Sequence, residues 1–217
     1  YVHEAFPKYK FRAYVPPSNI LSPQVREAIL ESLPDIRILS SLYDGSAEEE
    51  AYYQEFQREE NGVYDIPRIT AGYNPTGLDL YFECTVITSI GVFNHFVHPD
   101  ELFYEESKDK TWHMMKEGLQ EFLKQIDSRY GWLTAVTASE SLPYFDSYFN
   151  LDYRVLRKPD ELEIHCWNYT HEASFLLRST KEVASSKDCH VQKIGDEMYF
   201  VKITGPEAHI YWKGSSL

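Results

Sequence analysis

The sequence predicts an α/β region, either an open sheet or part of a β/α barrel, followed by a small antiparallel β module. Strand-like and helical segments alternate up to about residue 150, which is typical of parallel sheets and barrels. From about residue 151 onward the pattern changes to short strands separated by turns. Only four or five strand–helix units fit before this change, whereas a complete eight-unit barrel takes roughly 250 residues. We therefore place two domains at residues 1–150 and 151–217.

The first predicted elements follow one another closely. Ser22 and Pro23 supply the cap and the first turn of a helix. Ile36–Leu39 is typical of a buried strand, and Ile66–Ile69 is predicted to be a second strand. Leu78–Ser89 is mostly apolar but contains a β-branched run, so helix and strand both remain open for it.

The later elements have clearer patterns. Gly91–Phe93 is predicted to begin a strand that reaches His95, and Leu133–Val136 is predicted to be a strand as well. Thr137–Glu140 is predicted to cap a short helix that ends near Asn150. One apolar face predicts an amphipathic helix within 107–129; it comprises Trp112, Met115, Leu119, Phe122 and Ile126. Five strands are predicted after residue 152, at Glu161–Trp167, Ala173–Ser179, His190–Ile194, Met198–Ile203 and His209–Trp212.

Composition limits the possible partners. The 34 acidic and 21 basic residues give a net charge of −13, which argues against nucleic acid or an anionic membrane surface. A neutral or cationic substrate is compatible with this charge. Aromatic residues make up 15% of the chain, a composition that suits carbohydrate and protein surfaces. There is no run of eighteen apolar residues, so no transmembrane segment is expected.

The densest group of titratable residues follows the predicted strand at Gly91–Phe93. His95, His98 and Asp100 lie where parallel strands expose catalytic groups, and such residues bind metals or transfer protons. If the strand continues through this segment, the two histidines point to opposite faces. Arg68 could bind a substrate oxygen or pair with Asp100. The alternatives are a surface loop with local hydrogen bonds and a structural ion pair.

A second candidate lies near the start of the chain. Pro16 and Pro17 fix an extended backbone, which could hold Tyr14 and Asn19 beside a substrate. An ordinary loop before a capped helix is the alternative reading. The sequence contains no P-loop, dinucleotide fingerprint, Gly-x-Ser-x-Gly or His-Glu-x-x-His motif, which argues against nucleotide-dependent chemistry.

Four segments, taken in order, resemble the later part of bacterial NodB-like polysaccharide deacetylases. The resemblance covers most of residues 10–142 and is strongest to the large, uncharacterised or Pel-exopolysaccharide-associated branch. The segments that carry it are Tyr14–Asn19, Pro67–Tyr73, Gly91–Asp100 and Leu133–Glu140.

The resemblance implies a distorted β/α barrel that removes N-acetyl groups from amino sugars. It implies an Asp-His-His site for a divalent metal, zinc or similar, that activates water. His95 or His98 would be the general acid, with Asp100 or Arg68 orienting it. The segment Tyr14–Asn19 would line the substrate groove. A polysaccharide partner and an extracellular or cell-envelope location also follow from the resemblance.

The chain departs from the family at the metal site. Neither an Asp-Asp motif nor histidines spaced i and i+4 occur here, so the metal ligands are unknown and are expected in an upstream half of the same protein. The sequence therefore predicts a fragment or a degenerate member of a metal-dependent polysaccharide N-deacetylase. One alternative is a non-catalytic carbohydrate-binding protein of the cell envelope. Another is an unrelated metal hydrolase that uses His95, His98 and Asp100 as ligands.

Overall fold

The computed structural model describes residues 2–17, 20–40 and 56–214, and it divides into two units, Tyr1–Ala138 and Ser139–Leu217. The division lies before helix α5 (Ala138–Asn150), whereas the predicted boundary followed it. Within the second unit, the Ser147 hydroxyl donates to the carbonyl oxygen of His171 at 3.5 Å, which ties α5 to the strands. Among the described residues, no helix is both long and apolar enough to cross a bilayer.

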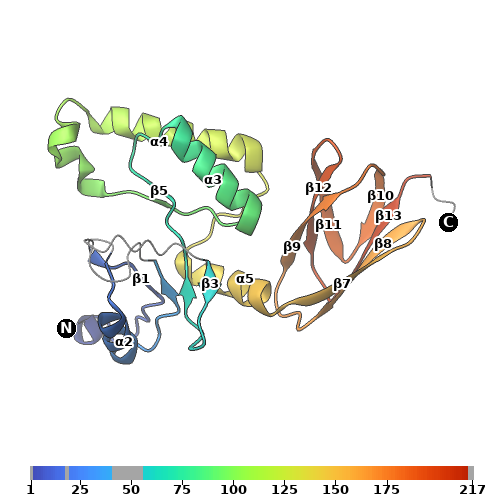
Figure 1. Cartoon of the computed structure of the whole chain (residues 1–217), viewed down its shortest axis with the longest axis horizontal. Helices are drawn as coiled ribbons and strands as arrows, with labels where there is room; N and C mark the ends of the chain where they lie inside the picture. The colour runs from blue at the N-terminus through green and yellow to red at the C-terminus, as the bar shows by residue number, and fades with distance from the viewer. Residues whose placement is uncertain (1, 18–19, 41–55, 215–217) are drawn as a thin grey trace. The chain divides into compact units, whose positions relative to one another are not determined.

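The first unit has an α/β architecture with two small sheets and no closed barrel among its described residues (Figure 1). Parallel pairing joins β1 to β2, β2 to β4 and, separately, β5 to β6, while β3 runs antiparallel to β4. A short helix α1 (Val2–Ala5) precedes them. The strands are β1 (Ala13–Tyr14), β2 (Ile38–Leu39), β3 (Gln57–Arg58), β4 (Tyr64–Asp65), β5 (Thr70–Ala71) and β6 (His95–Phe96).

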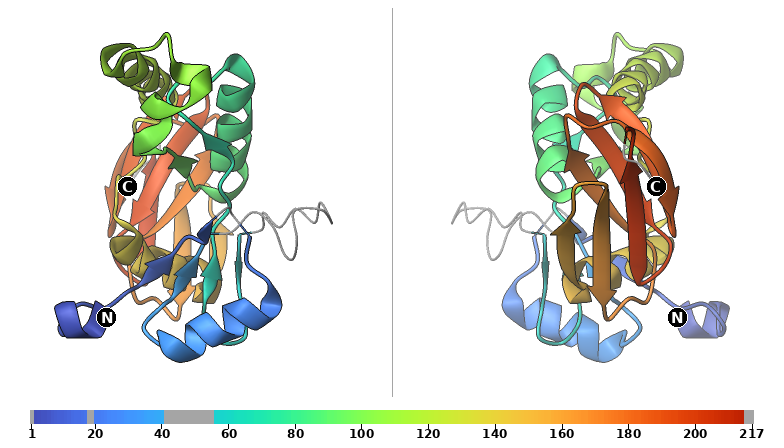
Figure 2. Two further views of the ribbon diagram at one scale, coloured as in Figure 1. Left: turned by 90° about the vertical axis from the view of Figure 1, so that its left-hand side faces the viewer. Right: turned by 90° about the vertical axis from the view of Figure 1, so that its right-hand side faces the viewer.

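Helix α2 (Pro23–Ser32) begins where the sequence predicts. The Ser22 hydroxyl accepts a hydrogen bond from the backbone N–H of Val25 at 3.4 Å, and Pro23 occupies the first turn. The helix lies alongside β1 and β2 (Figure 2). Its partly buried residues Ile29, Leu30 and Leu33 cover a core of Leu21, Ile36, Leu39 and Val63.

A buried ion pair also fixes α2. Arg26 Nη2 lies 3.2 Å from Oδ1 of Asp65 in β4, and it also pairs with Glu59. Gln57 Nε2 donates to Asp65 at 3.3 Å. Burial raises the pKa of Asp65 to about 6, although the charge of Arg26 opposes this effect. The charge of Arg26 therefore offsets only part of the cost of burying this carboxyl.

The ambiguous apolar segment is a helix, α3 (Gly77–Ile90). Thr76 and Asp79 form a capping box at its start. Gly91 ends it with φ = 73°, a left-handed conformation that glycine adopts without strain. The strand predicted to begin at Gly91 is therefore wrong in its start, since β6 begins at His95.

Helix α4 (Trp112–Tyr130) confirms the predicted amphipathic helix and lies beside α3 (Figure 1). Its residues Phe122 and Ile126 pack with Ile87 of α3 to form a second core. The predicted strand at Leu133–Val136 is wrong, because Leu133 packs on this core and no strand forms there in the described structure.

The strand predicted at Ile66–Ile69 is wrong, because β4 ends at Asp65 and β5 begins only at Thr70. The backbone N–H of Ile66 donates to the carbonyl oxygen of Leu39 at 2.9 Å. Pro67 has no N–H to donate, so the pairing with β2 ends there. The next strand, β5, pairs with β6 in a separate sheet.

The second unit contains two antiparallel sheets, in the orders β10-β13-β8-β7 and β11-β12-β9 (Figure 1). The predicted antiparallel module and its five strands are confirmed. The sequence missed β7 and β10, because both are largely exposed edge strands without an apolar run. The strands are β7 (Asp152–Arg157), β8 (Glu161–Trp167), β9 (Ala173–Arg178), β10 (Val183–Lys187), β11 (Cys189–Gly195), β12 (Met198–Ile203) and β13 (Glu207–Trp212).

A hydrophobic core lies between the strands of this unit. Alternate residues of β8, β12 and β13 point inward, as expected for strands with one face covered. The fully buried members include Val201, Ile203, Ala208 and Ile210. Cys166 and Cys189 also belong to this core and are free thiols.

Two glycine substitutions test the packing of the first unit. A Cβ on Gly118 of α4 would lie 2.7 Å from the carbonyl oxygen of Tyr73, so Gly118→Ala forces the helix away from that loop. We expect a loss of about 1–3 kcal/mol in the free energy of unfolding, as for other overpacked sites. Gly77→Ala is the matched control, since nothing lies within 4 Å of its added methyl. We expect the control to stay within about 0.5 kcal/mol of wild type in denaturant titrations.

Candidate functional site

The parallel pair β5–β6 brings together the predicted site residues from two distant segments. Thr70 lies opposite His95, and Ala71 lies opposite Phe96. Asn94 Nδ2 donates to the carbonyl oxygen of Pro67 at 3.0 Å, which fixes the same register before the strands begin. Arg68 lies two residues before β5, and His98 and Asp100 follow β6 at its carboxyl end.

His95 is held by both of its ring nitrogens. Nε2 lies 2.7 Å from the carbonyl oxygen of Gly72, and Nδ1 lies 2.7 Å from Oγ1 of Thr70. The ring packs against Phe93 and Phe122, with centroids 6.4 and 5.1 Å away. Both nitrogens are therefore used within the protein, which favours a structural role for His95 over that of metal ligand or direct proton donor.

Glu83, which sequence reasoning missed, completes this arrangement from α3. The side chain is fully buried, and Oε1 lies 2.5 Å from Oγ1 of Thr70. Oε2 is buried too and has no hydrogen-bond partner among the described residues. Burial raises the pKa of Glu83 to about 7, against the hydrogen bond from Thr70, which lowers it. An acidic residue within an otherwise apolar helix segment was the available sequence signal.

His98 and Asp100 form an exposed pair just beyond β6. Nδ1 of His98 lies 3.7 Å from Oδ1 of Asp100, and the side chains are 51% and 65% exposed. Pro99–Phe103 forms a 3₁₀ turn that starts at His98 and places Asp100 beside it. Of the two predicted histidines, His98 is therefore the one that solvent or a substrate can reach.

Aromatic contacts hold His98 in place. Its ring meets Phe96 edge-on, with centroids 4.5 Å apart. Arg68 is buried, and its guanidinium carbon lies 4.4 Å from the centroid of Phe96. Partial burial and the charges of Asp100 and Glu101 raise the pKa of Tyr104, which also lies near His98. Tyr104 consequently stays a neutral hydroxyl at physiological pH.

The predicted substrate-binding segment lies in the other sheet. Tyr14 is in β1 and packs on the core under α2, Pro16 is buried, and Pro17 is exposed. Asn19 lies outside the described residues. The proposed contact of this segment with a substrate stays a prediction.

Only one group of three potential metal ligands occurs among the described residues, and it lies in the second unit. Ligand atoms of Glu161, Glu163 and His209 lie within 4.8 Å of one another. The ammonium of Lys158 bonds to Glu161 at 2.8 Å and also to Glu163. These hydrogen bonds, with that of His165, lower the pKa of Glu163 to about 2. A lysine cation therefore already neutralises the carboxylates that would hold a metal.

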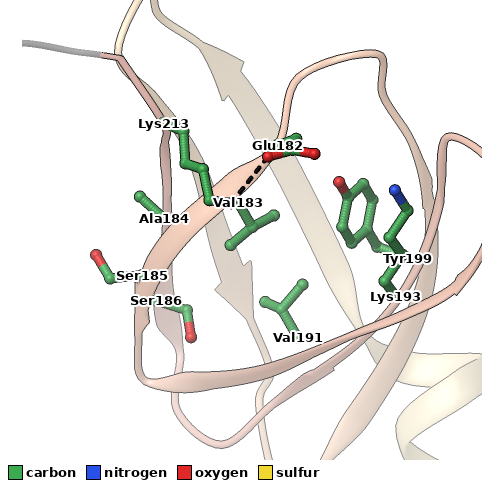
Figure 3. Close-up of a pocket in the computed structure, with 9 residues that line it drawn as sticks. All are labelled: Glu182, Val183, Ala184, Ser185, Ser186, Val191, Lys193, Tyr199 and Lys213. Atoms are coloured by element: carbon green, nitrogen blue, oxygen red, sulfur yellow. Dashed lines mark hydrogen bonds and ion pairs between the residues drawn. The ribbon is translucent and has the colours of Figure 1, made fainter.

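A hollow of about 360 Å³ opens between β10 and β11–β12 (Figure 3). Val183, Val191 and Tyr199 line it, and an ion pair between Glu182 and Lys213, 2.8 Å long, lies at one side. Tyr199 is buried, and its hydroxyl donates to a backbone carbonyl at 3.2 Å. Its ring therefore offers no open face on which a sugar could stack.

The buried carboxyl of Glu83 predicts a pH dependence of stability in the first unit. Its pKa is higher in the folded chain than the ordinary 4.5, so the folded state binds the proton more tightly. The contribution of Glu83 to the free energy of unfolding is then greatest below about pH 4.5, and it falls by up to about 3 kcal/mol as the pH rises through 7. Amide hydrogen exchange of α3, corrected for intrinsic rates, should report this loss between pH 5 and pH 7.

The variant Glu83→Gln isolates this effect. The raised pKa of Asp65 also makes the free energy of unfolding fall as the pH rises, and this contribution is the same in wild type and in Glu83→Gln. We expect the exchange of α3 to depend less on pH in the variant. An unchanged pH dependence would show that Glu83 titrates normally.

A family model described as an uncharacterised protein conserved in bacteria, DUF2194, matches residues 1–200. No curated protein and no solved structure gives a significant match. The match spans most of both units and does not itself connect the chain to NodB-like deacetylases. On this evidence, the chain belongs to the DUF2194 family of bacterial proteins.

Proposed function

We propose that this chain contributes the acid–base residues of a polysaccharide deacetylase that acts on N-acetylated amino sugars. The observation that carries the proposal is the exposed His98–Asp100 pair at the carboxyl end of β6. Exposed ends of parallel strands are the usual place for catalytic groups in α/β proteins. The resemblance to NodB-like deacetylases supports the same segment.

The geometry of the pair suits proton transfer. Asp100 faces Nδ1 of His98, which leaves Nε2 as the ring nitrogen proposed to meet a substrate. Hydrolysis of an acetamide needs a proton on the departing amine, and an imidazolium can supply it. The distance of 3.7 Å is longer than a hydrogen bond, and catalytic contacts are often long without substrate. His98 is thus proposed as the proton donor and Asp100 as the residue that orients it.

The described residues do not fit the Asp-His-His metal site of the resembling family. His95 uses both ring nitrogens within the protein, which leaves His98 and Asp100 as two candidate ligands. The group in the second unit is occupied by the ammonium of Lys158. No step of the proposed chemistry is therefore assigned to a metal held by these residues.

The charge around His98 supports a neutral or cationic sugar. Asp100 and Glu101 belong to the 3₁₀ turn, and Glu105 and Glu106 follow it in a second one, Glu105–Ser107. Carboxylates at this density repel an anionic polymer. An N-acetylated amino sugar is neutral, and its deacetylated product is a cation. Both are compatible with this surface.

A second candidate function is glycan binding by the antiparallel unit. Trp167 of β8 is 54% exposed. Strand alternation places its ring on the outer face of the sheet. Exposed aromatic rings of this kind stack on sugars. Loss of glycan binding in Trp167→Ala would favour this function, provided that no acetate is released.

Acetate release from an oligomer of N-acetylglucosamine tests the proposed activity. We expect the full-length natural protein to release acetate and His98→Ala to lower kcat/KM by about 10²–10⁴, the usual contribution of an acid–base residue. Asp100→Asn should lower it less, because it removes orientation and not the proton donor. His113→Ala is the matched control, since His113 also lies exposed beside a carboxylate, 3.3 Å from Glu117. Full activity in His98→Ala, or no acetate from the wild type, would contradict the proposal.

A further inference from the structure

A continuous chain of hydrogen bonds runs through the first unit from Glu83 to Gly72. It passes from Oε1 of Glu83 to Oγ1 of Thr70, then to Nδ1 of His95, and from Nε2 to the carbonyl oxygen of Gly72. The three side chains come from α3, β5 and β6. These hydrogen bonds thus join α3 to both β5 and β6, the strand pair that precedes His98.

The number of available protons limits which atoms can donate and which can accept along this series of hydrogen bonds. The carbonyl oxygen of Gly72 only accepts, so Nε2 of His95 carries a proton. The Thr70 hydroxyl has one proton and can donate it to Glu83 or to His95, but not to both. If it donates to a neutral His95, Glu83 must be protonated and donate to Thr70. If it donates to an ionised Glu83, His95 must be an imidazolium that donates to Thr70.

We propose that Glu83, Thr70 and His95 share one mobile proton and titrate as a single unit that locks α3 to the β5–β6 pair. The two arrangements differ by a concerted shift. The carboxyl O–H of Glu83 breaks as a new O–H forms on Thr70, while the original hydroxyl proton of Thr70 moves to Nδ1 of His95. The net charge of the unit is zero before and after the shift. His95 is then a positioning residue, three positions before His98.

The surroundings of Glu83 favour the neutral acid as the major form. Its Oε2 has no hydrogen-bond partner among the described residues, and an unpaired carboxylate oxygen costs more free energy than an unpaired carbonyl oxygen. Asp79, on the same helix, adds a negative charge that disfavours ionisation of Glu83. Thr70 faces Glu83, and His95 lies beyond Thr70. From α4, the Tyr130 hydroxyl donates to the carbonyl oxygen of Cys84, the residue after Glu83, at 3.2 Å. A positive charge on the His95 ring contacts Glu83 only indirectly, through the Thr70 hydroxyl.

Nuclear magnetic resonance of the intact chain tests the proposal without any activity. The carboxyl carbon of Glu83 and the ring nitrogens of His95 are followed against pH. Two groups that share a proton report the same two macroscopic steps. We expect both nuclei to show two steps at the same pH values. A single step at each nucleus, at unrelated pH values, would overturn the proposal.

Variants at Thr70 separate proton sharing from simple proximity of charges. Thr70→Ser keeps the hydroxyl and should keep two steps at each nucleus. Thr70→Val has nearly the same shape without the hydroxyl, and the smaller step at each nucleus should be lost. Retention of both steps in Thr70→Val would show that charge alone couples the groups, and it would contradict the proposal.

The variant Glu83→Gln provides an independent check. The amide can donate to Thr70, so Thr70 donates to His95 and the neutral Nε2–H tautomer is fixed. We expect a single step at the His95 ring, displaced to lower pH from the wild-type range. An identical His95 titration in wild type and Glu83→Gln would overturn the proposal. The exposed His190 is the internal control, and its titration should not change. Because no substrate is used, failure here is distinct from failure of the proposed deacetylase activity.

Discussion

The first unit depends on how a buried carboxyl is accommodated between a helix and two strands. Glu83 faces Thr70 and, through it, His95. Burial of an unpaired carboxylate would cost several kcal/mol, so the hydrogen bonds and the raised pKa of Glu83 are conditions for the fold. The same bonds set the register of β5 and β6. That register in turn places His98 and Asp100 beyond the end of β6.

The second unit satisfies its polar groups in a different way. Its core is apolar throughout, and its carboxylates Glu161 and Glu163 lie on the outer face beside Lys158. Direct ion pairing there keeps the pKa of Glu163 low, whereas burial without a direct cation keeps that of Glu83 high. Acidification thus protonates Glu83 at higher pH than Glu163.

Sequence patterns predicted the elements whose apolar spacing is regular. Helix α4 and the inward-facing strands of the second unit have such spacing and were confirmed. Strands β7 and β10 were missed because edge strands need no apolar run. Leu133 was wrongly assigned to a strand because an apolar residue that packs on helices gives the same sequence pattern as one in a buried strand. Ser22, as a helix cap, was predicted correctly because the signal is local.

The candidate site was predictable only in part. The segment from His95 to Asp100 was identified from its density of titratable groups. The different roles of His95 and His98 could not be predicted, because they depend on Thr70 and Glu83, which lie 25 and 12 residues earlier in the chain. An acidic residue in a mostly apolar segment gives no indication of its partner. Tertiary structure alone brings these groups together.

We propose that an N-acetylated amino sugar binds at the His98–Asp100 pair after β6. Chemical-shift mapping of the intact chain with an oligomer of N-acetylglucosamine tests it most directly. We expect perturbed signals at His98, Asp100 and Tyr104, with the signals of the antiparallel unit unchanged. Perturbation confined to Trp167 and Tyr211, with none at His98, would contradict it.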